Sequence, residues 1–335
     1  MFDFLVALRS SVFGLRYSNY FKMSKVAIID LGTNTFNLLV AGVNGDGTYQ
    51  IIHSGKLPVK LGEGGINQKF IAPAAYQRGL NAIGEHLRTI LLHGASEIFA
   101  FATSATRNAS NGNNFTDDIK NLYGIDVKVI DGDEEAELIY LGVRQAVLLN
   151  DQNVLIIDIG GGSNEIIIGN GQRYLWKRSY DLGVSRLLQK FSPSDPIKPT
   201  EIEQVEKYLE KELSDMVEPM QKHQPAIIIG SSGSFDTYRS VLTAAKAIEP
   251  NGNPSVEIPL KEYFKLHSHL ITTTKEQRNT IPGMDPMRVE MIVLATIFTN
   301  FLIKKFGIER MMQSVYALKE GAIWKLIRSS LLRSR

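Results

Sequence analysis

Two segments of the chain follow the same pattern, and this repetition restricts the fold more than any other feature. In each, a run of branched apolar residues ends on an aspartate, a glycine-containing polar turn follows, and a second apolar run begins. The segments are VAIIDLGTNTFNLLVAGV (26–43) and VLIIDIGGGSNEIIIG (154–169). Such runs, bounded by Gly and small polar residues, are typical of buried strands joined by a tight turn. The pattern predicts a duplicated strand–turn–strand unit.

Strands and helices alternate after each copy of this unit. Residues 73–93 have apolar residues at helical spacing behind a proline, and residues 131–149 open another helix. Thr200 and Glu203 have the spacing of a capping box, which predicts a helix start there. A chain of 335 residues suits two domains. We therefore expect two layered α/β domains, 23–148 and 149–335, flanking a cleft that both aspartate–glycine turns face.

Composition excludes several classes of protein. The net charge is +2, which argues against a nucleic-acid polymer or a membrane surface as partner. The chain has no cysteine, so disulfides and cysteine-based zinc sites are excluded, and a reducing compartment, the cytoplasm, is expected. The six histidines are scattered without ligand spacing, which argues against zinc. The apolar run at 291–301 is too short for a membrane span and predicts a buried helix.

Residues 1–22 have no basic region before their apolar stretch and no small-residue cleavage site, so a signal peptide is not indicated. The first convincing strand begins at Val26. We expect Met23 to be the natural start and residues 1–22 to be an upstream extension that does not belong to the native protein.

The glycine turns point to phosphate chemistry. Backbone N–H groups in such a turn can converge on phosphate oxygens, and glycine permits a close approach. An aspartate beside the turn would repel phosphate unless it held a hydrated Mg²⁺, which neutralises the charge. Two facing turns would hold a chain of phosphates. The alternative is a pair of hairpins in which each aspartate bonds its own turn; the matched spacing in both copies favours the phosphate site.

Several motifs together resemble the exopolyphosphatase / guanosine pentaphosphate phosphohydrolase family. They are DLGTNTFNLLV (30–40), ATSATR (102–107), GDEEAELIYLGV (132–143), IDIGGGSNEIIIG (157–169), GSSGSFDT (230–237), IPGMDPMRVEMI (281–292) and ALKEGAI (317–323). The resemblance implies two actin-like (ribonuclease H-like) domains flanking the active-site cleft. It also implies the short form, without a C-terminal helical HD-type domain, and a last helix that returns to the first domain.

The resemblance assigns roles to individual residues. Glu135, the second glutamate at a helix start, would orient and deprotonate the attacking water, although acidic residues there also serve as helix caps. Arg107 would bind the phosphate being cleaved, because a guanidinium suits two of its oxygens. Expected metal-site residues are Asp158, Glu165 and, with less support, Asp30. Expected phosphate-binding residues are Gly32, Thr33, Asn34, Thr35, Gly160, Gly161, Gly162, Ser163, Gly230, Ser231, Ser232 and Gly233.

Some residues are left with open roles. The loop at 230–237 could hold a guanosine moiety or close the cleft. Glu137 stands where the family often has an arginine that could contact substrate. Cations near the two turns that could grip a polyanion are Lys56, Lys60, Lys177, Arg178 and Arg186.

The predicted function is Mg²⁺-dependent release of terminal orthophosphate from inorganic polyphosphate, with Mn²⁺ as a substitute metal. One alternative is guanosine pentaphosphate (pppGpp) 5′-phosphohydrolysis. Others are a non-catalytic protein that binds guanosine polyphosphates, and a sugar or acid kinase of the same superfamily. The glutamate pair and ATSATR argue against a kinase, and the complete set of acids argues against a site without activity. A homodimer is left open.

Overall fold

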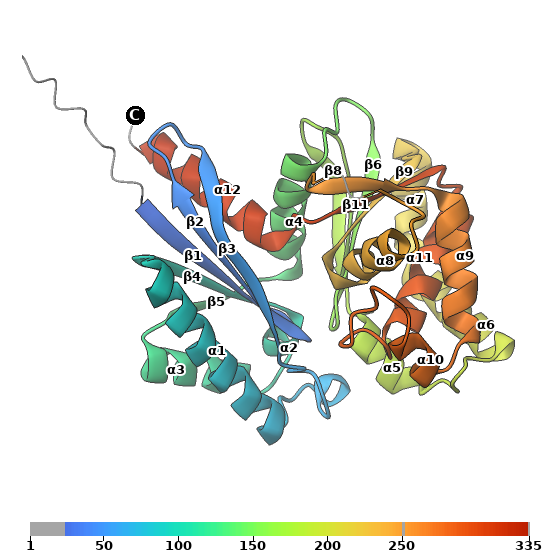
Figure 1. Ribbon diagram of the computed structural model, residues 1–335, viewed down its shortest axis with the longest axis horizontal. Coiled ribbons are helices and arrows are strands. Elements are labelled where there is room, and N and C mark those ends of the chain that lie inside the picture. The colour runs from blue at the N-terminus through green and yellow to red at the C-terminus, as the bar shows by residue number, and fades with distance from the viewer. Residues whose placement is uncertain (1–23, 250–251, 334–335) are drawn as a thin grey trace, which may run out of the picture.

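The computed structural model describes residues 24–249 and 252–333, so the expected extension at 1–22 lies outside the described residues. Two sheets, each flanked by helices, lie side by side (Figure 1). The predicted α/β class with two domains is confirmed.

The first sheet has five strands in the order β3-β2-β1-β4-β5. Its strands are β1 (Ser24–Leu31), β2 (Thr35–Val43), β3 (Tyr49–Pro58), β4 (Glu97–Ala102) and β5 (Val127–Val129). The helices of this half are α1 (Pro73–His93), α2 (Ser104–Arg107), α3 (Gly112–Tyr123) and α4 (Gly132–Ala146).

The second sheet has six strands in the order β10-β11-β9-β6-β7-β8. Its strands are β6 (Val154–Ile159), β7 (Asn164–Gly169), β8 (Tyr174–Tyr180), β9 (Ile227–Ser231), β10 (Ser255–Ile258) and β11 (Arg310–Ser314). The helices of this half are α5 (Val184–Phe191), α6 (Pro199–Glu212), α7 (Val217–His223), α8 (Ser232–Ala244), α9 (Leu260–Thr272), α10 (Lys275–Asn279), α11 (Ile292–Phe306) and α12 (Leu318–Arg333).

The strand register confirms the duplication. β1 pairs antiparallel with β2, which places Asp30 opposite Asn37. β6 pairs antiparallel with β7, which places Asp158 opposite Glu165. The first strand of each unit also pairs parallel with a later strand, β1 with β4 and β6 with β9. The two halves therefore carry their functional hairpins at equivalent positions in their sheets.

Both faces of each sheet are buried, which explains the near-continuous apolar runs in β1 and β6. Alternate side chains of β1 point to different cores: Ala27 and Ile29 pack with α1 and α3, whereas Val26 and Ile28 pack in the core between the two sheets. α4 and α12 contribute to this central core, which also contains Ile156 of β6.

α4 and α12 are exchanged between the halves. α12 packs against β1 and β2 of the first sheet, whereas α4 packs against β7 and β8 of the second (Figure 1). The two helices also pack against each other. The last helix thus lies on the first sheet, and a helix encoded in the first half lies on the second. The domain boundary at 148/149 stays a prediction. α4 precedes this boundary but packs on the second sheet, and α12 follows it but packs on the first.

Two sequence expectations outside the site have definite outcomes. The capping box at Thr200 and Glu203 is wrong: α6 begins at Pro199, and the Glu201 carboxylate accepts a hydrogen bond from the Lys198 backbone N–H at 2.8 Å. The start lies earlier because proline suits the first helical position.

The apolar run at 291–301 forms most of α11, whose side chains are largely buried, as predicted. Among the described residues, no helix combines the length and the apolar character needed to cross a bilayer.

We expect Gly321→Ala to destabilise the contact between α4 and α12. A β-carbon on Gly321 would lie 1.8 Å from the Leu138 carbonyl oxygen, and one on Gly142 would lie 1.9 Å from the Ala317 carbonyl oxygen. The backbones touch at these positions, so the helices must move apart, at about 1–3 kcal/mol of unfolding free energy. Thermal unfolding measures the loss. Gly84→Ala of α1 is the control, because its nearest neighbours are side-chain atoms of Tyr123 that can move. Equal stability of the two variants would contradict the close helix contact.

Candidate active site

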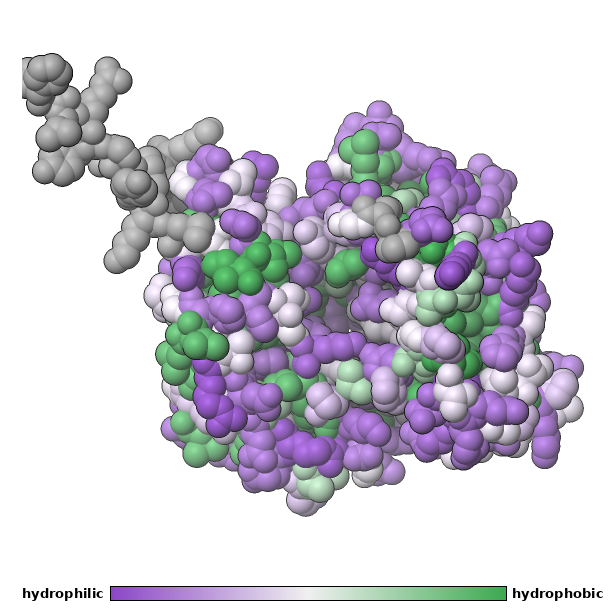
Figure 2. All heavy atoms as spheres, in the orientation of Figure 1, coloured by the Kyte–Doolittle hydropathy of each residue, from purple (hydrophilic) through white to green (hydrophobic). Residues whose placement is uncertain are grey.

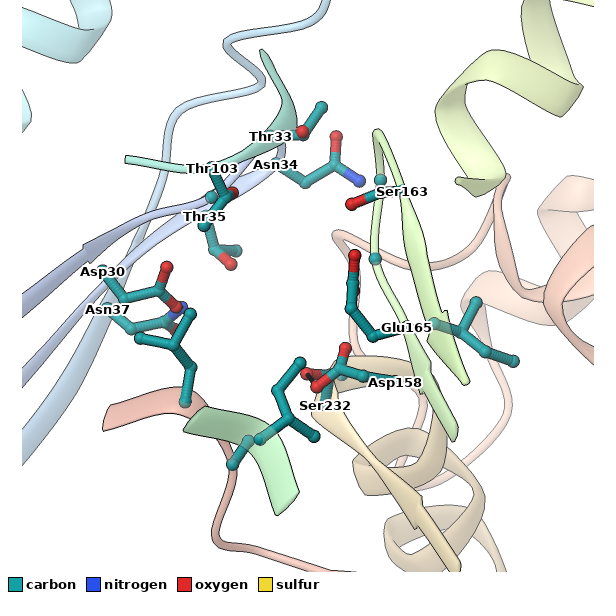
Figure 3. Close-up of a pocket in the computed structure, with 18 of the residues that line it drawn as sticks. Asp30, Thr33, Asn34, Thr35, Asn37, Thr103, Asp158, Ser163, Glu165 and Ser232 are labelled. Carbon is teal, nitrogen blue, oxygen red and sulfur yellow. Dashed lines mark hydrogen bonds between the residues drawn. The ribbon is translucent and has the colours of Figure 1, made fainter. Parts of the chain in front are cut away.

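The candidate site is a cavity of about 130 Å³ between the two halves. Figure 2 shows a hollow in the surface at this place. Both aspartate–glycine turns line it, together with residues from β3, α4, α8 and the start of α12. Figure 3 shows the labelled side chains of the two hairpins facing each other across the cavity. The structure therefore brings the two turns together, as the sequence predicts.

The two turns have the same backbone geometry. In the first, the Gly32 N–H donates to the Thr35 carbonyl at 3.1 Å, and in the second the Gly160 N–H donates to the Ser163 carbonyl at 3.1 Å. A β-carbon on Gly32 would lie 2.8 Å from the Thr35 oxygen, and one on Gly160 would lie 2.7 Å from the Ser163 oxygen. Glycine is required at both positions for this turn to close.

The tips of the turns touch across the cleft. A β-carbon on Gly161 would lie 2.4 Å from Nδ2 of Asn34, and one on Gly162 would lie 2.5 Å from Oγ1 of Thr33. Ser185 of α5 donates to Oδ1 of Asn34 at 2.9 Å. The small residues in the turns thus allow the halves to approach until the cleft is closed.

Arg186 holds the second turn against the first half. Its Nε donates to the Gly162 carbonyl at 2.8 Å, and its Nη1 donates to the Ile66 carbonyl at 2.9 Å. Lys56 of β3 and Asp285 form a further bond between the halves at 2.7 Å. These contacts stabilise the closed arrangement of the two halves.

Asp158 and Glu165 form a buried pair of acids on neighbouring strands of the second hairpin. Asp158 is 6% exposed and accepts hydrogen bonds at Oδ2 from the hydroxyls of Ser231, at 2.8 Å, and Ser232, at 2.6 Å. Glu165 is 2% exposed and accepts from the Ser179 hydroxyl at 2.6 Å. Burial raises the pKa of Asp158; burial and the neighbouring Asp158 raise the pKa of Glu165 to about 7. Burial therefore disfavours the ionised form of both acids.

Asp30 has a different partner. It is half-buried and accepts a hydrogen bond from Nδ2 of Asn37 at 2.8 Å, and burial raises its pKa to about 6. Asn37 occupies the position that Glu165 occupies in the second hairpin. Asn37 is not among the predicted site residues, although the shared seven-residue spacing from the aspartate identifies its position.

Glu135 and Arg107 meet at one side of the cavity. Nη1 of Arg107 donates to Oε2 of Glu135 at 2.8 Å and to the Ile130 carbonyl at 3.0 Å. Glu135 is 7% exposed, and burial together with the nearby Glu165 raises its pKa well above that of a free glutamate, against the effect of Arg107. Glu135 lines the cavity, whereas Arg107 contacts it only through Glu135.

The neighbouring acids at the start of α4 are structural. Asp131 is the N-cap, and its Oδ1 accepts from the Glu134 N–H at 2.7 Å. Glu134 points away from the cavity and forms an ion pair with Lys128 at 2.6 Å. Capping therefore accounts for Asp131, and Glu135 is the glutamate of the pair that reaches the cavity.

The 230–233 segment splits into two parts. Ser232 and Gly233, at the start of α8, line the cavity, whereas Gly230 and Ser231 do not. A β-carbon on Gly230 would lie 2.0 Å from the Phe235 ring, so this glycine makes room for core packing. Ser231 positions Asp158. Phosphate contact by Gly230 and Ser231 stays a prediction.

Of the five candidate cations, only Lys56 lines the cavity. Lys177 donates to the Asp133 carbonyl at 2.6 Å, Arg178 pairs with Asp215, and Lys60 lies outside the cavity. Glu137 forms an ion pair with Lys325 of α12 at 3.0 Å, so this position joins the two exchanged helices.

Five polar residues of the lining had no predicted role. Arg288 and Lys319 fall within two of the family motifs, 281–292 and 317–323, but had no function assigned to them. The full set is Asn37, Thr103, Asp236, Arg288 and Lys319. They come from β2, the end of β4, α8, the segment before α11 and the first turn of α12, so only the folded chain shows that they share a cavity.

The acids fit a sparsely coordinated magnesium ion better than a fully protein-ligated metal. Among residues 24–249 and 252–333, no three His, Cys, Asp or Glu side chains gather closely enough to enclose a metal. Mg²⁺ commonly keeps several waters and takes one or two carboxylates. Asp158 and Glu165, opposite each other on β6 and β7, supply that number.

Comparison with known proteins decides the family. The sequence model of the Ppx/GppA phosphatase family matches residues 39–330. The chain belongs to this family. The resemblance read from the motifs is thereby confirmed, and with it the enzyme class, a phosphoanhydride hydrolase.

Several relatives cover nearly the whole chain. Exopolyphosphatase 1 of Mycobacterium leprae is 26% identical over 308 residues, which are 91% of this chain and 90% of the relative. A putative exopolyphosphatase of Haemophilus influenzae is 27% identical, covering 90% and 91%. The crystal structure of an exopolyphosphatase from Cytophaga hutchinsonii superposes with a TM-score of 0.89 at 33% identity, covering 91% and 98%. The Aquifex aeolicus PPX-GPPA enzyme has the same fold, with a TM-score of 0.75 at 23% identity.

Proposed function

We propose that this Ppx/GppA family member releases terminal orthophosphate from inorganic polyphosphate in a Mg²⁺-dependent reaction. The observation that carries the proposal is the position of Glu135, a buried carboxylate that faces a cavity bounded by two phosphate-type turns. The names of the relatives from Mycobacterium leprae and Cytophaga hutchinsonii support polyphosphate as substrate.

Glu135 is the base. Arg107 holds Oε2 of Glu135, and no described residue donates a hydrogen bond to Oε1, which is left to accept a proton from water. The raised pKa of Glu135 makes it a stronger base than a free glutamate. Water attacks the terminal phosphorus, its proton passes to Oε1, and the bond from phosphorus to the bridging oxygen breaks. The electron pair stays on that oxygen, at the end of the shortened chain.

The turns and acids orient the substrate. Backbone N–H groups of Gly160–Ser163 and Gly32–Thr35 would contact phosphate oxygens, which fixes the terminal phosphate relative to Glu135. Asp158 and Glu165 would hold Mg²⁺, which supplies neutralisation of phosphate charge and polarisation of the P–O bond when bound. The closed turns exclude bulk water, so that each charge interaction is stronger than in solution.

The test compares three substrates with the purified protein and Mg²⁺: long-chain polyphosphate, guanosine pentaphosphate, and ATP with sugars. We expect orthophosphate as the first product from polyphosphate, with the chain shortening gradually on gels, and no activity in excess EDTA. Release of internal fragments, or full activity in EDTA, would contradict the proposal. Turnover of guanosine pentaphosphate alone would assign the second activity that the family name covers.

A further inference from the structure

Arg288 is a buried cation that faces the cavity without a bonded partner. It is 6% exposed and lines the cavity close to the first turn of α8. A β-carbon on Gly233 would lie 2.1 Å from its Nη2, so only glycine lets the guanidinium approach the helix there. Its Nε is buried without a hydrogen-bond partner, and among the described residues the guanidinium forms no hydrogen bond or ion pair. Burial of an unpaired charge is unfavourable, which indicates a ligand.

The acids around Arg288 already have other partners. Asp158 accepts from Ser231 and Ser232, Asp236 accepts from Gln313 Nε2 at 2.8 Å, and Asp285 pairs with Lys56. These carboxylates favour the charged form of Arg288 from a distance but leave its N–H groups unused. The guanidinium is therefore available to an anion that enters the cavity.

Two further features favour an anion beside Arg288. The N-terminal turn of α8, a helix of 13 residues, presents free backbone N–H groups and the positive end of the helix dipole at Ser232 and Gly233. Lys319, in the first turn of α12, lines the same cavity and lies 3.3 Å from Glu320. An arginine, a lysine and a helix N-terminus from three separate elements thus converge on one end of the cavity.

The neighbours of the acids separate this group from Glu135. Arg288 and Lys319 lie near Asp158 and Asp236, whereas Arg107 is the cation beside Glu135. Asp158 and Glu165 are cross-strand neighbours; Glu165 lies near Glu135, and Asp158 is bonded to Ser232 of α8. In Figure 3, Ser232 lies beside Asp158. Phosphoryl transfer to water proceeds roughly in line, with the attacking and leaving oxygens on opposite sides of phosphorus. If water is on the side of Glu135, the leaving oxygen is on the side of Arg288.

We propose that Arg288 and Lys319, with the first turn of α8, form a subsite for the leaving phosphate, the second phosphate of the polyphosphate chain. The inference rests on the proposed function of the same cavity. As the bond from the terminal phosphorus to the bridging oxygen breaks, negative charge grows on that oxygen and its phosphate. A preorganised guanidinium stabilises this charge, and one such donor is typically worth about 10²–10³ in rate.

The experiment measures turnover and anion binding separately. Arg288→Gln and Lys319→Gln each remove one cation, and Arg88→Gln on the exposed surface of α1 is the matched control. Tripolyphosphate turnover gives kcat and KM, and calorimetry with pyrophosphate, which mimics the leaving chain, gives binding. We expect Arg288→Gln to lower kcat about 10²-fold or more. It should also weaken pyrophosphate binding at least tenfold. Lys319→Gln should have smaller effects on both kcat and pyrophosphate binding, and Arg88→Gln should have no effect on either. Arg288→Lys should recover part of the binding.

Two outcomes would overturn the inference. Unchanged pyrophosphate binding in Arg288→Gln, with the variant folded by circular dichroism and thermal melting, would make Arg288 structural. Equal losses in Arg88→Gln would show a general charge effect. The proposed function fails in a different way: if the unaltered protein binds pyrophosphate through Arg288 but turns over no polyphosphate, the subsite holds and the polyphosphatase assignment does not.

Discussion

Glu135→Gln is expected to lower kcat for polyphosphate by about 10²–10⁴, because a positioned acid–base group typically contributes this factor. Glutamine keeps the shape and can still accept the hydrogen bond from Arg107, but it cannot take the proton from water. The protein should fold normally, since burial disfavours the charged form of Glu135 and the amide is neutral. Initial rates of orthophosphate release, together with a melting curve, test both parts of this expectation.

The pH dependence follows from the same residue. Burial and Glu165 raise the pKa of Glu135, and the base acts only when it is ionised. As the pH is lowered, the rate should therefore begin to fall at a higher pH than it would with a free glutamate as the base. The residual rate of Glu135→Gln should not show this decrease at low pH, the acidic limb of the pH–rate profile. An acidic limb that is identical in both proteins would assign it to another group.

Glu134→Gln is the matched control, one residue away. Glu134 pairs with Lys128 near the surface, and such ion pairs contribute about 0–1 kcal/mol to stability. Turnover should stay near that of the unaltered protein. Loss of turnover in Glu134→Gln with activity kept in Glu135→Gln would reverse the assignment of the catalytic glutamate.

The duplicated hairpins were predictable from sequence because their signals are local. The apolar runs, the glycine spacing and the repeated aspartate predict the turns at Gly32 and at Gly160 without knowledge of the rest of the chain. The capping aspartate, Asp131, is likewise a local signal. Family motifs added the choice between Glu134 and Glu135, and the structure gives the reason: only Glu135 faces the cavity.

The other half of the site depends on tertiary packing. Arg288 precedes a buried helix and Lys319 begins the last one, and nothing in their local sequence distinguishes them from surface cations. Lys319 reaches the cavity because α12 crosses to the first sheet and contacts α4 through Gly142 and Gly321. Arg288 reaches it because Gly233 of α8 leaves room for the guanidinium. Long-range contacts of this kind leave no periodic signal, so the charges that complete the cavity are visible only in the fold.

Asp158→Asn is expected to raise the Mg²⁺ concentration needed for half-maximal activity and to lower kcat. Asp158 and Glu165 are the only pair of acids placed directly opposite each other by the two described functional hairpins, since Asp30 faces Asn37. Removing one of the two carboxylates halves the protein charge available to the cation. Titration of activity with Mg²⁺ at saturating polyphosphate measures both effects. Because Asn can still accept hydrogen bonds from Ser231 and Ser232, the position of α8 should be kept.

Asp30→Asn is the matched control, because Asp30 occupies the equivalent position in the first hairpin. With an amide as its partner, it offers the cation a single carboxylate, so the shift in Mg²⁺ requirement should be smaller than for Asp158→Asn. Binding of tripolyphosphate in EDTA separates metal from substrate effects. In Asp158→Asn this metal-free binding should be unchanged or tighter, because one negative charge near the phosphates is gone. If metal-free binding is lost while the Mg²⁺ requirement is unaltered, Asp158 serves the turn and the cation is held elsewhere.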